Sequence, residues 1–364
     1  MSIGVGIIGA GVISDTYLTN LTSFPDVKVL HVADIDTARA QAQAGKHGVP
    51  KAGNVADLLA DPDVDLVVNL TIPAAHAEVG LAALDAGKHV WTEKPLALDR
   101  QTGRKLLDRA QEKGLRVACA PDTVLGAGLQ TARRAIDEGR IGKPMTALAL
   151  FQVSGPESWH PAPEFFFQAG GGPLLDMGPY YLTSLVSLLG PISKVTGTGG
   201  QARATRVIGS GPRAGTEFAV TVPTTVSALV EFAGGGSAQI VLSFDSALHR
   251  AGFLELTGTG GAAVLPDPNY FDGPTQLYLP GKDEPEELVA QGHAASRGTG
   301  ALELARAIKA GVPERASGEL AYHVLDVMLS IEESIEAGRS VEVRSTTDVP
   351  PALPADWDPY EKTF

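Results

Sequence analysis

Two glycines and a serine near the start of the chain have the spacing of a phosphate-binding turn. Gly9, Gly11 and Ser14 follow a short apolar run and open a segment whose apolar residues recur at helical spacing. The first glycine permits a tight turn, the second lets backbone approach a pyrophosphate, and the small third residue allows helix and strand to pack closely. The helix N-terminus at Val12 and Ile13 offers backbone amides to an anion. The pattern therefore predicts a dinucleotide site.

Asp34 is the acid that we expect to bind the ribose of that dinucleotide. It ends the second apolar run, 23 positions after Gly11, where dinucleotide-binding domains carry an acidic residue that accepts the ribose hydroxyls. A carboxylate repels a 2′-phosphate, so the sequence favours NAD, while Arg39 is close enough in sequence to admit NADP. The alternative is that Asp34 only caps a helix or turn.

Three further segments follow the glycine motif in a fixed order. They are Thr71-Ile72-Pro73-Ala74-Ala75-His76, Glu93-Lys94-Pro95 and Gly170-Gly171-Gly172-Pro173-Leu174-Leu175-Asp176-Met177-Gly178-Pro179-Tyr180. With these motifs the chain, over essentially its whole length, resembles the Gfo/Idh/MocA oxidoreductase family. The resemblance implies an NAD(P)-dependent oxidoreductase acting on CH–OH groups, assembled as a homodimer or homotetramer. It also implies that Thr71, Pro73, His76, Glu93 and Lys94 lie at the cofactor.

Lys94 is the catalytic acid/base that the resemblance implies, and it is also expected to bind substrate. Oxidation of a secondary alcohol needs a proton acceptor at the hydroxyl while hydride leaves. A lysine serves where desolvation or a neighbouring positive charge lowers its pKa. In the family the lysine of this motif ends a strand and faces the nicotinamide, and Pro95 fixes the backbone that aims it. The alternative is a solvated loop lysine.

Asp176 and Tyr180 are the other catalytic candidates, and both are also expected to bind substrate. Four positions apart, they would lie on one face of a helix. The family usually has Asp and His at these positions, so the tyrosine is a departure. A phenol suits neutral-pH proton exchange less well than imidazole, which leaves the acid/base role to Lys94 and makes Tyr180 a hydrogen-bond donor. Packing of Tyr180 and a helix-terminal role for Asp176 stay open.

Three more residues are candidates for substrate binding. Many relatives in the family carry an Asn/Arg-rich segment where this chain has Ala-Pro-Asp-Thr-Val-Leu-Gly at 120–126. The loss of cations argues against an anionic substrate, and Asp122 would suit sugar hydroxyls. Trp159 and His160 precede the aromatic run 165–167 in a loop expected to overhang the pocket. We expect Trp159 to stack on a sugar face and His160 to bind a hydroxyl or exchange a proton; aromatic packing and a structural histidine are the alternatives.

These residues support three hypotheses of function. The first is hydride transfer between nicotinamide and a secondary hydroxyl or ketone of a sugar, glycoside or cyclitol. The second is redox-neutral glycoside hydrolysis through transient ring oxidation and elimination, a chemistry that some relatives in the family use. The third is a dinucleotide-binding sensor without catalysis, against which the retained Lys94 and Asp176 speak.

Composition excludes several other classes of protein. The 364 residues include 29 Lys+Arg and 42 Asp+Glu, a net charge of −13 that disfavours nucleic acid. Cys119 is the only cysteine, so no internal disulfide forms. Asp245 and His249 have no third ligand at a recognisable spacing, and we expect no metal. No apolar run reaches the roughly 18 residues of a membrane span, and no leader precedes the glycine motif, so we expect a cytoplasmic protein without membrane contact.

The elements that position these residues follow from apolar patterning. Short apolar runs alternate with helix-period segments over the first 120 residues, which predicts a parallel sheet of the Rossmann type. Asp99 is expected to cap one helix and Gly87 to end another. Strand patterns then dominate, interrupted by helices expected at 179–189, 301–310 and 319–337. The sequence therefore predicts an α/β dinucleotide-binding domain at 1–120. It is followed by an α+β substrate-binding and oligomerisation domain at 121–364, with a large, open, mostly antiparallel sheet.

Overall fold

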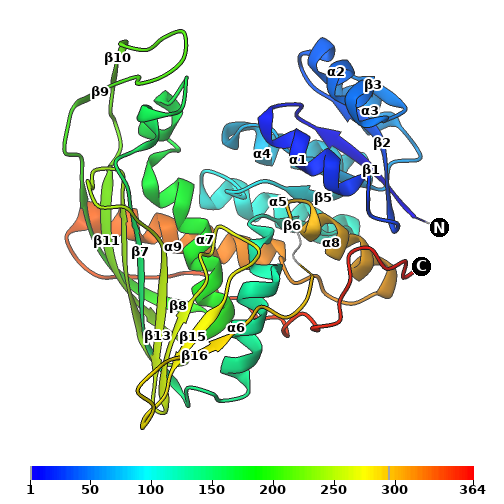
Figure 1. The fold of residues 1–364 in the computed structure, drawn as a ribbon. Helices are drawn as coiled ribbons and strands as arrows, with labels where there is room; N and C mark the ends of the chain where they lie inside the picture. Colours follow the sequence, from blue (N-terminus) through cyan, green and yellow to red (C-terminus); the bar gives the residue numbers. More distant parts are fainter. Residues whose placement is uncertain (1, 294–295) are drawn as a thin grey trace. The chain divides into compact units, whose positions relative to one another are not determined.

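A parallel six-stranded sheet forms the first part of the fold, as the sequence predicts. The computed structural model describes residues 2–293 and 296–364 (Figure 1). The strands are β1 (Ile3–Ile8), β2 (Val27–Ala33), β3 (Lys51–Gly53), β4 (Leu66–Asn69), β5 (His89–Thr92) and β6 (Val117–Cys119). Their order is β3-β2-β1-β4-β5-β6, and all pairs are parallel. The winding reverses between β1 and β4, so a ligand is expected at the carboxyl ends of these strands.

Helices connect these strands. They are α1 (Val12–Leu21), α2 (Thr37–His47), α3 (Val55–Ala60), η1 (Pro73–Ala75), α4 (His76–Asp85), α5 (Arg100–Lys113) and η2 (Asp122–Leu125), and α8 (Thr299–Ala310) packs near β5 and β6. Two predicted helix ends are confirmed: Asp99 accepts a hydrogen bond from the Thr102 amide, and Gly87, with φ +77°, follows α4. The sequence did not indicate β3 or α3, because segments of three and six residues show no clear apolar period.

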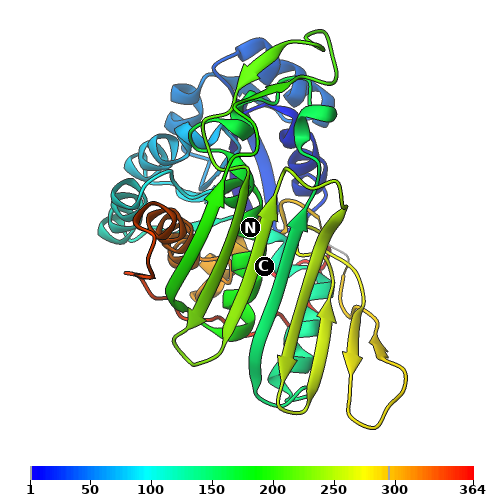
Figure 2. The ribbon, with the colours of Figure 1, turned by 90° about the vertical axis from the view of Figure 1, so that its left-hand side faces the viewer.

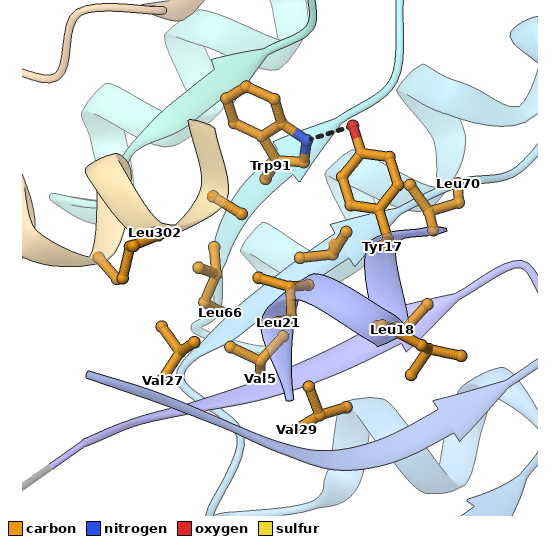
Figure 3. Close-up of a cluster of buried hydrophobic side chains, with 14 of the residues drawn as sticks. Val5, Tyr17, Leu18, Leu21, Val27, Val29, Leu66, Leu70, Trp91 and Leu302 are labelled. Atoms are coloured by element: carbon orange, nitrogen blue, oxygen red, sulfur yellow. Dashed lines mark hydrogen bonds between the residues drawn. The ribbon is translucent and has the colours of Figure 1, made fainter. Parts of the chain in front are cut away.

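Apolar side chains fix α1 on the sheet. Val5 and Leu66 from the strands, Leu18 and Leu21 from α1, and Leu302 from α8 belong to one core cluster, and each is 0% exposed (Figure 3). Burial of a large apolar side chain contributes about 1.5–3 kcal/mol. This cluster therefore holds the helix that begins at the glycine motif in a defined place.

A second, nine-stranded sheet contains the β-rich half of the chain. Its strands are β7 (Pro144–Gln152), β8 (Ile192–Gly200), β11 (Thr225–Phe232), β12 (Ser237–Ser243), β13 (Arg250–Gly258), β14 (Gly261–Leu265), β15 (Thr275–Tyr278), β16 (Glu286–Leu288) and β17 (Val341–Glu342). The order is β16-β15-β14-β13-β7-β12-β11-β8-β17. Only the pair β7–β12 is parallel within this sheet, so the predicted mostly antiparallel sheet is confirmed. A separate hairpin pairs β9 (Thr205–Val207) with β10 (Glu217–Ala219).

Helices cover one face of this sheet. The helical segments of this half are α6 (Ala127–Asp137), η3 (Pro156–Ser158), η4 (Glu164–Phe167), α7 (Gly172–Leu189) and α9 (Gly318–Ala337). α7 packs on β7, β11 and β12, and α9 packs on β8, where Ile331 and Ile335 lie against Gly197. Figure 2 shows the opposite face of the sheet, which carries no helix.

α7 begins seven residues before the predicted start at Pro179. The sequence-based reading placed Pro179 at the first turn, where proline is favoured. The structure has Pro173 in that first turn and Pro179 inside the helix. An interior proline costs about 3 kcal/mol, and burial of nearly the whole helix, from Gly172 through Val186, offsets that cost. The longer helix contains both Asp176 and Tyr180, as their predicted placement on one helix face requires.

The chain folds into two compact units that differ from the predicted ranges 1–120 and 121–364. Unit 1 contains residues 1–127, 291–322 and 350–364, and unit 2 contains residues 128–290 and 323–349. The C-terminal segments join unit 1 through polar contacts that sequence patterns do not reveal. Asp26, 0% exposed, accepts hydrogen bonds from Arg306 in α8 and from the Thr363 amide.

Across residues 2–293 and 296–364, no helix has the length and apolar composition needed to cross a bilayer.

His323 on α9 makes two hydrogen bonds inside the fold. Its Nε2 accepts the Ile192 amide at 3.0 Å, and its Nδ1 lies 3.0 Å from the hydroxyl of Ser345. The first bond needs an unprotonated Nε2, so the folded chain holds neutral imidazole. Burial lowers the pKa of His323 from 6.5 to about 4.

His323 is predicted to destabilise the fold at acid pH. The unfolded chain takes up a proton below its ordinary pKa of 6.5, whereas the folded chain resists it until about pH 4. The free energy of unfolding should therefore fall by about 3 kcal/mol between these pH values because of this residue. Urea unfolding of wild type and His323→Gln from pH 7 to pH 4 tests this, with the half-exposed His293→Gln as control. Equal pH dependence in wild type and His323→Gln would contradict the prediction.

Candidate active site

The glycine motif packs tightly against the end of β4. Gly9 has φ +103°, and a Cβ there would lie 2.6 Å from the Leu70 carbonyl oxygen. Gly11 is different, because a Cβ built on it meets nothing within 4 Å. No side chain caps the α1 N-terminus that follows, and the Ser14 hydroxyl donates to the Gly11 carbonyl at 2.6 Å. There is thus no room for a side chain at Gly9, whereas the space beside Gly11 and the uncapped helix N-terminus is open. Pyrophosphate binding requires both features.

Asp34 joins the end of β2 to this loop. Its Oδ2 accepts the Ala10 amide at 2.7 Å, and its Oδ1 accepts the Asp36 amide at 2.8 Å. Each carboxylate oxygen keeps a further lone pair for a ribose hydroxyl. Arg39 lies at the start of α2 and pairs with Asp36 at 3.5 Å on the surface. The alternative that Asp34 caps a turn is correct in one respect, since Asp34 accepts the Asp36 amide. The residue that caps α2, however, is Asp36.

Large apolar side chains are exposed at the ends of three adjacent strands. Val12 after β1 is 96% exposed, Ile35 after β2 is 98% exposed, and Ile72 after β4 is 69% exposed. Exposed apolar side chains gathered at one site mark binding surfaces. The three residues follow neighbouring strands of the sheet, on the edge that carries the glycine loop. Ile35 was not predicted as a site residue, because an isolated isoleucine after a strand carries no sequence signal.

A buried polar cluster connects the ends of β4 and β5. Asn69 accepts the Thr71 hydroxyl at 2.7 Å and donates to the His76 carbonyl at 2.9 Å. His76, 1% exposed, places Nδ1 2.7 Å from the Pro95 carbonyl and Nε2 3.0 Å from the Thr71 carbonyl. Burial lowers the pKa of His76. The predicted residues Thr71, Pro73 and His76 therefore lie together, and the single N–H of a neutral His76 ring donates to one of these two carbonyl oxygens.

Lys94 is the second residue after β5, and its backbone is held on both sides. Its amide donates to Oε2 of Glu93 at 3.2 Å, while Oε1 of Glu93 accepts the Tyr17 hydroxyl at 2.7 Å. The Lys94–Pro95 peptide is cis, and the carbonyl of Pro95 contacts His76 as described. The Lys94 side chain is half-buried. The structure thus places Glu93 and Lys94 on the sheet edge that also carries the glycine motif.

The prediction of Asp122 as a substrate ligand is wrong, because its side chain is buried inside the fold. Its carboxylate is 0% exposed and accepts the amides of Gly298 and Gly300 at 2.8 and 3.2 Å. Arg297 lies 3.5 Å away. Burial raises the pKa of Asp122, and Arg297 opposes that shift. The side chain therefore anchors the start of α8 and presents no free surface to a sugar.

The remaining predicted residues lie in unit 2. Asp176 and Tyr180 share a face of α7, where Tyr180 is 7% exposed and Asp176 is half-buried. Trp159 is 65% exposed. The ring of His160 contacts the rings of Trp159, Phe165 and Phe166 at centroid distances of 5.3–5.5 Å. The structure thus makes Trp159 and His160 parts of one aromatic cluster.

Asp245, considered above as half of a metal pair, has other partners. It forms ion pairs and hydrogen bonds with Arg206 and Thr224. No group of three His, Cys, Asp or Glu side chains within the described residues could hold a metal ion. Cys119 is buried, and burial raises the pKa of its thiol well above the ordinary value, so it lies protonated inside the sheet.

Two segments of the chain match models of known protein families. Residues 3–120 match the "Oxidoreductase family, NAD-binding Rossmann fold", and residues 129–264 match the "GFO/IDH/MocA C-terminal domain". The first match covers all of the glycine motif, Asp34 and the Glu93-Lys94-Pro95 segment described above.

Individual relatives agree with these matches. Trans-1,2-dihydrobenzene-1,2-diol dehydrogenase of Bos taurus is 30% identical over 285 residues, 78% of this chain and 79% of that protein. 1,5-Anhydro-D-fructose reductase of Ensifer adhaerens is 34% identical over 177 residues, 47% of this chain and 52% of that protein. The fold matches levoglucosan dehydrogenase, solved with NADH and L-sorbose, with a TM-score of 0.82 at 21% identity, over 94% of this chain and 99% of that one. The chain therefore belongs to the Gfo/Idh/MocA family of NAD(P)-dependent oxidoreductases that act on CH–OH groups.

Proposed function

We propose that this protein transfers hydride between NAD and a ring carbon that carries a secondary hydroxyl or ketone, with Lys94 as the acid/base. The observation that carries the proposal is the placement of Lys94. It follows β5 at the sheet edge of the glycine motif, with its backbone fixed by Glu93 on one side and His76 on the other. A proton acceptor there has the fixed position that catalysis in a near-attack geometry needs.

The chemistry divides between cofactor and protein in a simple way. Bound NAD supplies the hydride acceptor at its nicotinamide ring. Lys94 takes the hydroxyl proton at Nζ during oxidation and returns it during reduction. Gly9 and Gly11 hold the pyrophosphate with the amides of the α1 N-terminus, and Asp34 accepts the ribose hydroxyls.

The names of the relatives support the proposed substrate class. One is named for a cyclic diol and one for an anhydro sugar. Both compounds are six-membered rings with oxygen on neighbouring carbons, which supports a sugar, glycoside or cyclitol here. Within unit 2, Asp176 and Tyr180 are proposed to orient substrate oxygens, Trp159 to stack on the ring and His160 to bind a hydroxyl or exchange a proton. The relatives are named as dehydrogenases and reductases, so they favour net redox chemistry over the hydrolase and sensor alternatives.

Removal of the Lys94 amine should abolish most of the chemistry. We expect Lys94→Ala to lower kcat by about 10²- to 10⁴-fold, because general acid–base catalysis contributes this much, while affinity for NADH changes little. NADH absorbance with a panel of myo-inositol, levoglucosan, 1,5-anhydro-D-fructose and trans-1,2-dihydrobenzene-1,2-diol measures this. The exposed Lys105→Ala on α5 is the matched control. A Lys94→Ala enzyme with full turnover would remove the acid/base role.

Asp34 should set the choice between NAD and NADP. Asp34→Asn keeps an acceptor oxygen for the Ala10 amide but removes the negative charge that repels a 2′-phosphate. We expect the ratio of NADP to NAD affinity to rise about tenfold or more, since the repulsion between two nearby unit charges is worth at least about 1–2 kcal/mol. Calorimetric titration of both reduced cofactors tests this, with exposed Asp63→Asn as control. An unchanged ratio would mean that Asp34 does not face the ribose.

A further inference from the structure

A buried tyrosine links the first helix to the Glu93-Lys94 segment. Tyr17 lies in α1, and its ring is 0% exposed within the core cluster around β1 (Figure 3). Its hydroxyl donates to Oε1 of Glu93 at 2.7 Å. The indole Nε1 of Trp91, on β5, lies 3.2 Å from the same hydroxyl oxygen, and Figure 3 shows this bond as a dashed line.

These hydrogen bonds can run in one direction only. An indole nitrogen donates and never accepts, so the Tyr17 oxygen must accept from Trp91. The single hydroxyl proton of Tyr17 is then directed at Glu93. Burial, with the negative charge of Glu93, raises the pKa of Tyr17 well above its ordinary value, so the phenol stays a donor. Tyr17 is therefore a permanent donor to one carboxylate oxygen.

Trp91 is itself held in place. Its side chain is 0% exposed, and Gly300 in α8 lies so close that a Cβ there would overlap the indole ring. The indole has no room to rotate, so the direction of its N–H is set by packing. Asp122, which accepts the Gly300 amide, fixes the same part of α8.

Glu93 completes the series with its second oxygen. Oε1 accepts from Tyr17 and Oε2 accepts the Lys94 amide. A carboxylate held at both oxygens keeps one rotamer, and this rotamer fixes the peptide from which the Lys94 side chain departs. The series Trp91–Tyr17–Glu93 ends at the backbone of the proposed acid/base.

We propose that Tyr17 is a positioning residue for the reaction: through Glu93 it sets the placement of the Lys94 amine. The proposal rests on the role of Lys94 proposed above. Tyr17 follows the glycine motif on α1, so the helix that begins at the cofactor loop also aligns the proton acceptor.

Tyr17→Phe tests the proposal, because it removes one hydroxyl and keeps the buried ring. We expect kcat to fall about tenfold to a hundredfold, the effect of a small misplacement of a reacting group, while KM and NADH affinity change little. The assay uses whichever compound of the panel above is turned over. Trp91→Phe removes the N–H that orients Tyr17 together with part of the buried ring, and should act in the same direction.

A second readout does not depend on turnover. The rate at which acetic anhydride modifies Lys94, compared with Lys105 in the same molecule by mass spectrometry, reports the surroundings of the amine. We expect this ratio to change about threefold or more in Tyr17→Phe. The matched control is Tyr181→Phe in α7, which also removes a fully buried hydroxyl, one bonded to the Leu150 carbonyl and the Gly252 amide.

The outcomes separate this proposal from the proposed function. An unchanged labelling ratio and unchanged kcat in Tyr17→Phe would overturn the positioning role, whatever Lys94→Ala does. Equal changes in labelling for Tyr17→Phe and Tyr181→Phe would also overturn it, because they would reflect a general loss of stability. A changed ratio in Tyr17→Phe together with full activity of Lys94→Ala would leave the positioning intact and reject the acid/base role.

Discussion

The close approach of Gly9 to the carbonyl of Leu70 is the constraint on which the rest of the site depends. The loop after β1 lies so close to the end of β4 that no Cβ would fit between Gly9 and the Leu70 carbonyl. The tight loop brings Ala10 within reach of the Asp34 carboxylate at the end of β2. Three strand ends thus meet at one point, and α1 begins there with amides that no side chain caps.

Polar side chains at this edge are used mainly to hold backbone. Asp34 accepts two amides, His76 contacts two carbonyl oxygens, and Glu93 accepts the amide of Lys94. Buried polar groups must be satisfied, and a network with every member bonded makes a site rigid. The net charge of −13 disfavours phosphate binding by bulk charge, so we propose that the loop amides hold the phosphates of the dinucleotide.

Local patterns in the sequence predicted a large part of this arrangement. The glycine spacing and Asp34 depend on residues near in sequence, and the alternation of strands and helices implied the parallel sheet. The expectation for the Glu93-Lys94-Pro95 segment came from the family resemblance. The link from Tyr17 to Glu93 could not be predicted, because it joins residues 76 positions apart and leaves no period. The same holds for Asp122, whose partners lie more than 170 positions away. Its polarity suggested a sugar ligand, whereas burial against α8 gives it a structural partner.

Contacts between residues far apart in sequence also explain why the predicted domain ranges differ from the two units. The segments 291–322 and 350–364 follow the β-rich half in sequence but pack with the parallel sheet. Their order in the sequence assigned them to the predicted second domain. Contacts such as those of Asp26 show instead that they belong to unit 1. The missed start of α7 has another origin, since a buried helix tolerates a proline that local propensity excludes.

Calorimetric titration of NADH into wild type and Gly11→Ala tests the cofactor loop most directly. Gly11 has φ −74°, and its added Cβ meets nothing within 4 Å, so the variant should fold and unfold like wild type. If the open space beside Gly11 receives the pyrophosphate, the added methyl group stands in its way, and NADH affinity should fall about tenfold or more. Unchanged affinity in a folded Gly11→Ala protein would contradict the account of this loop as the cofactor cradle.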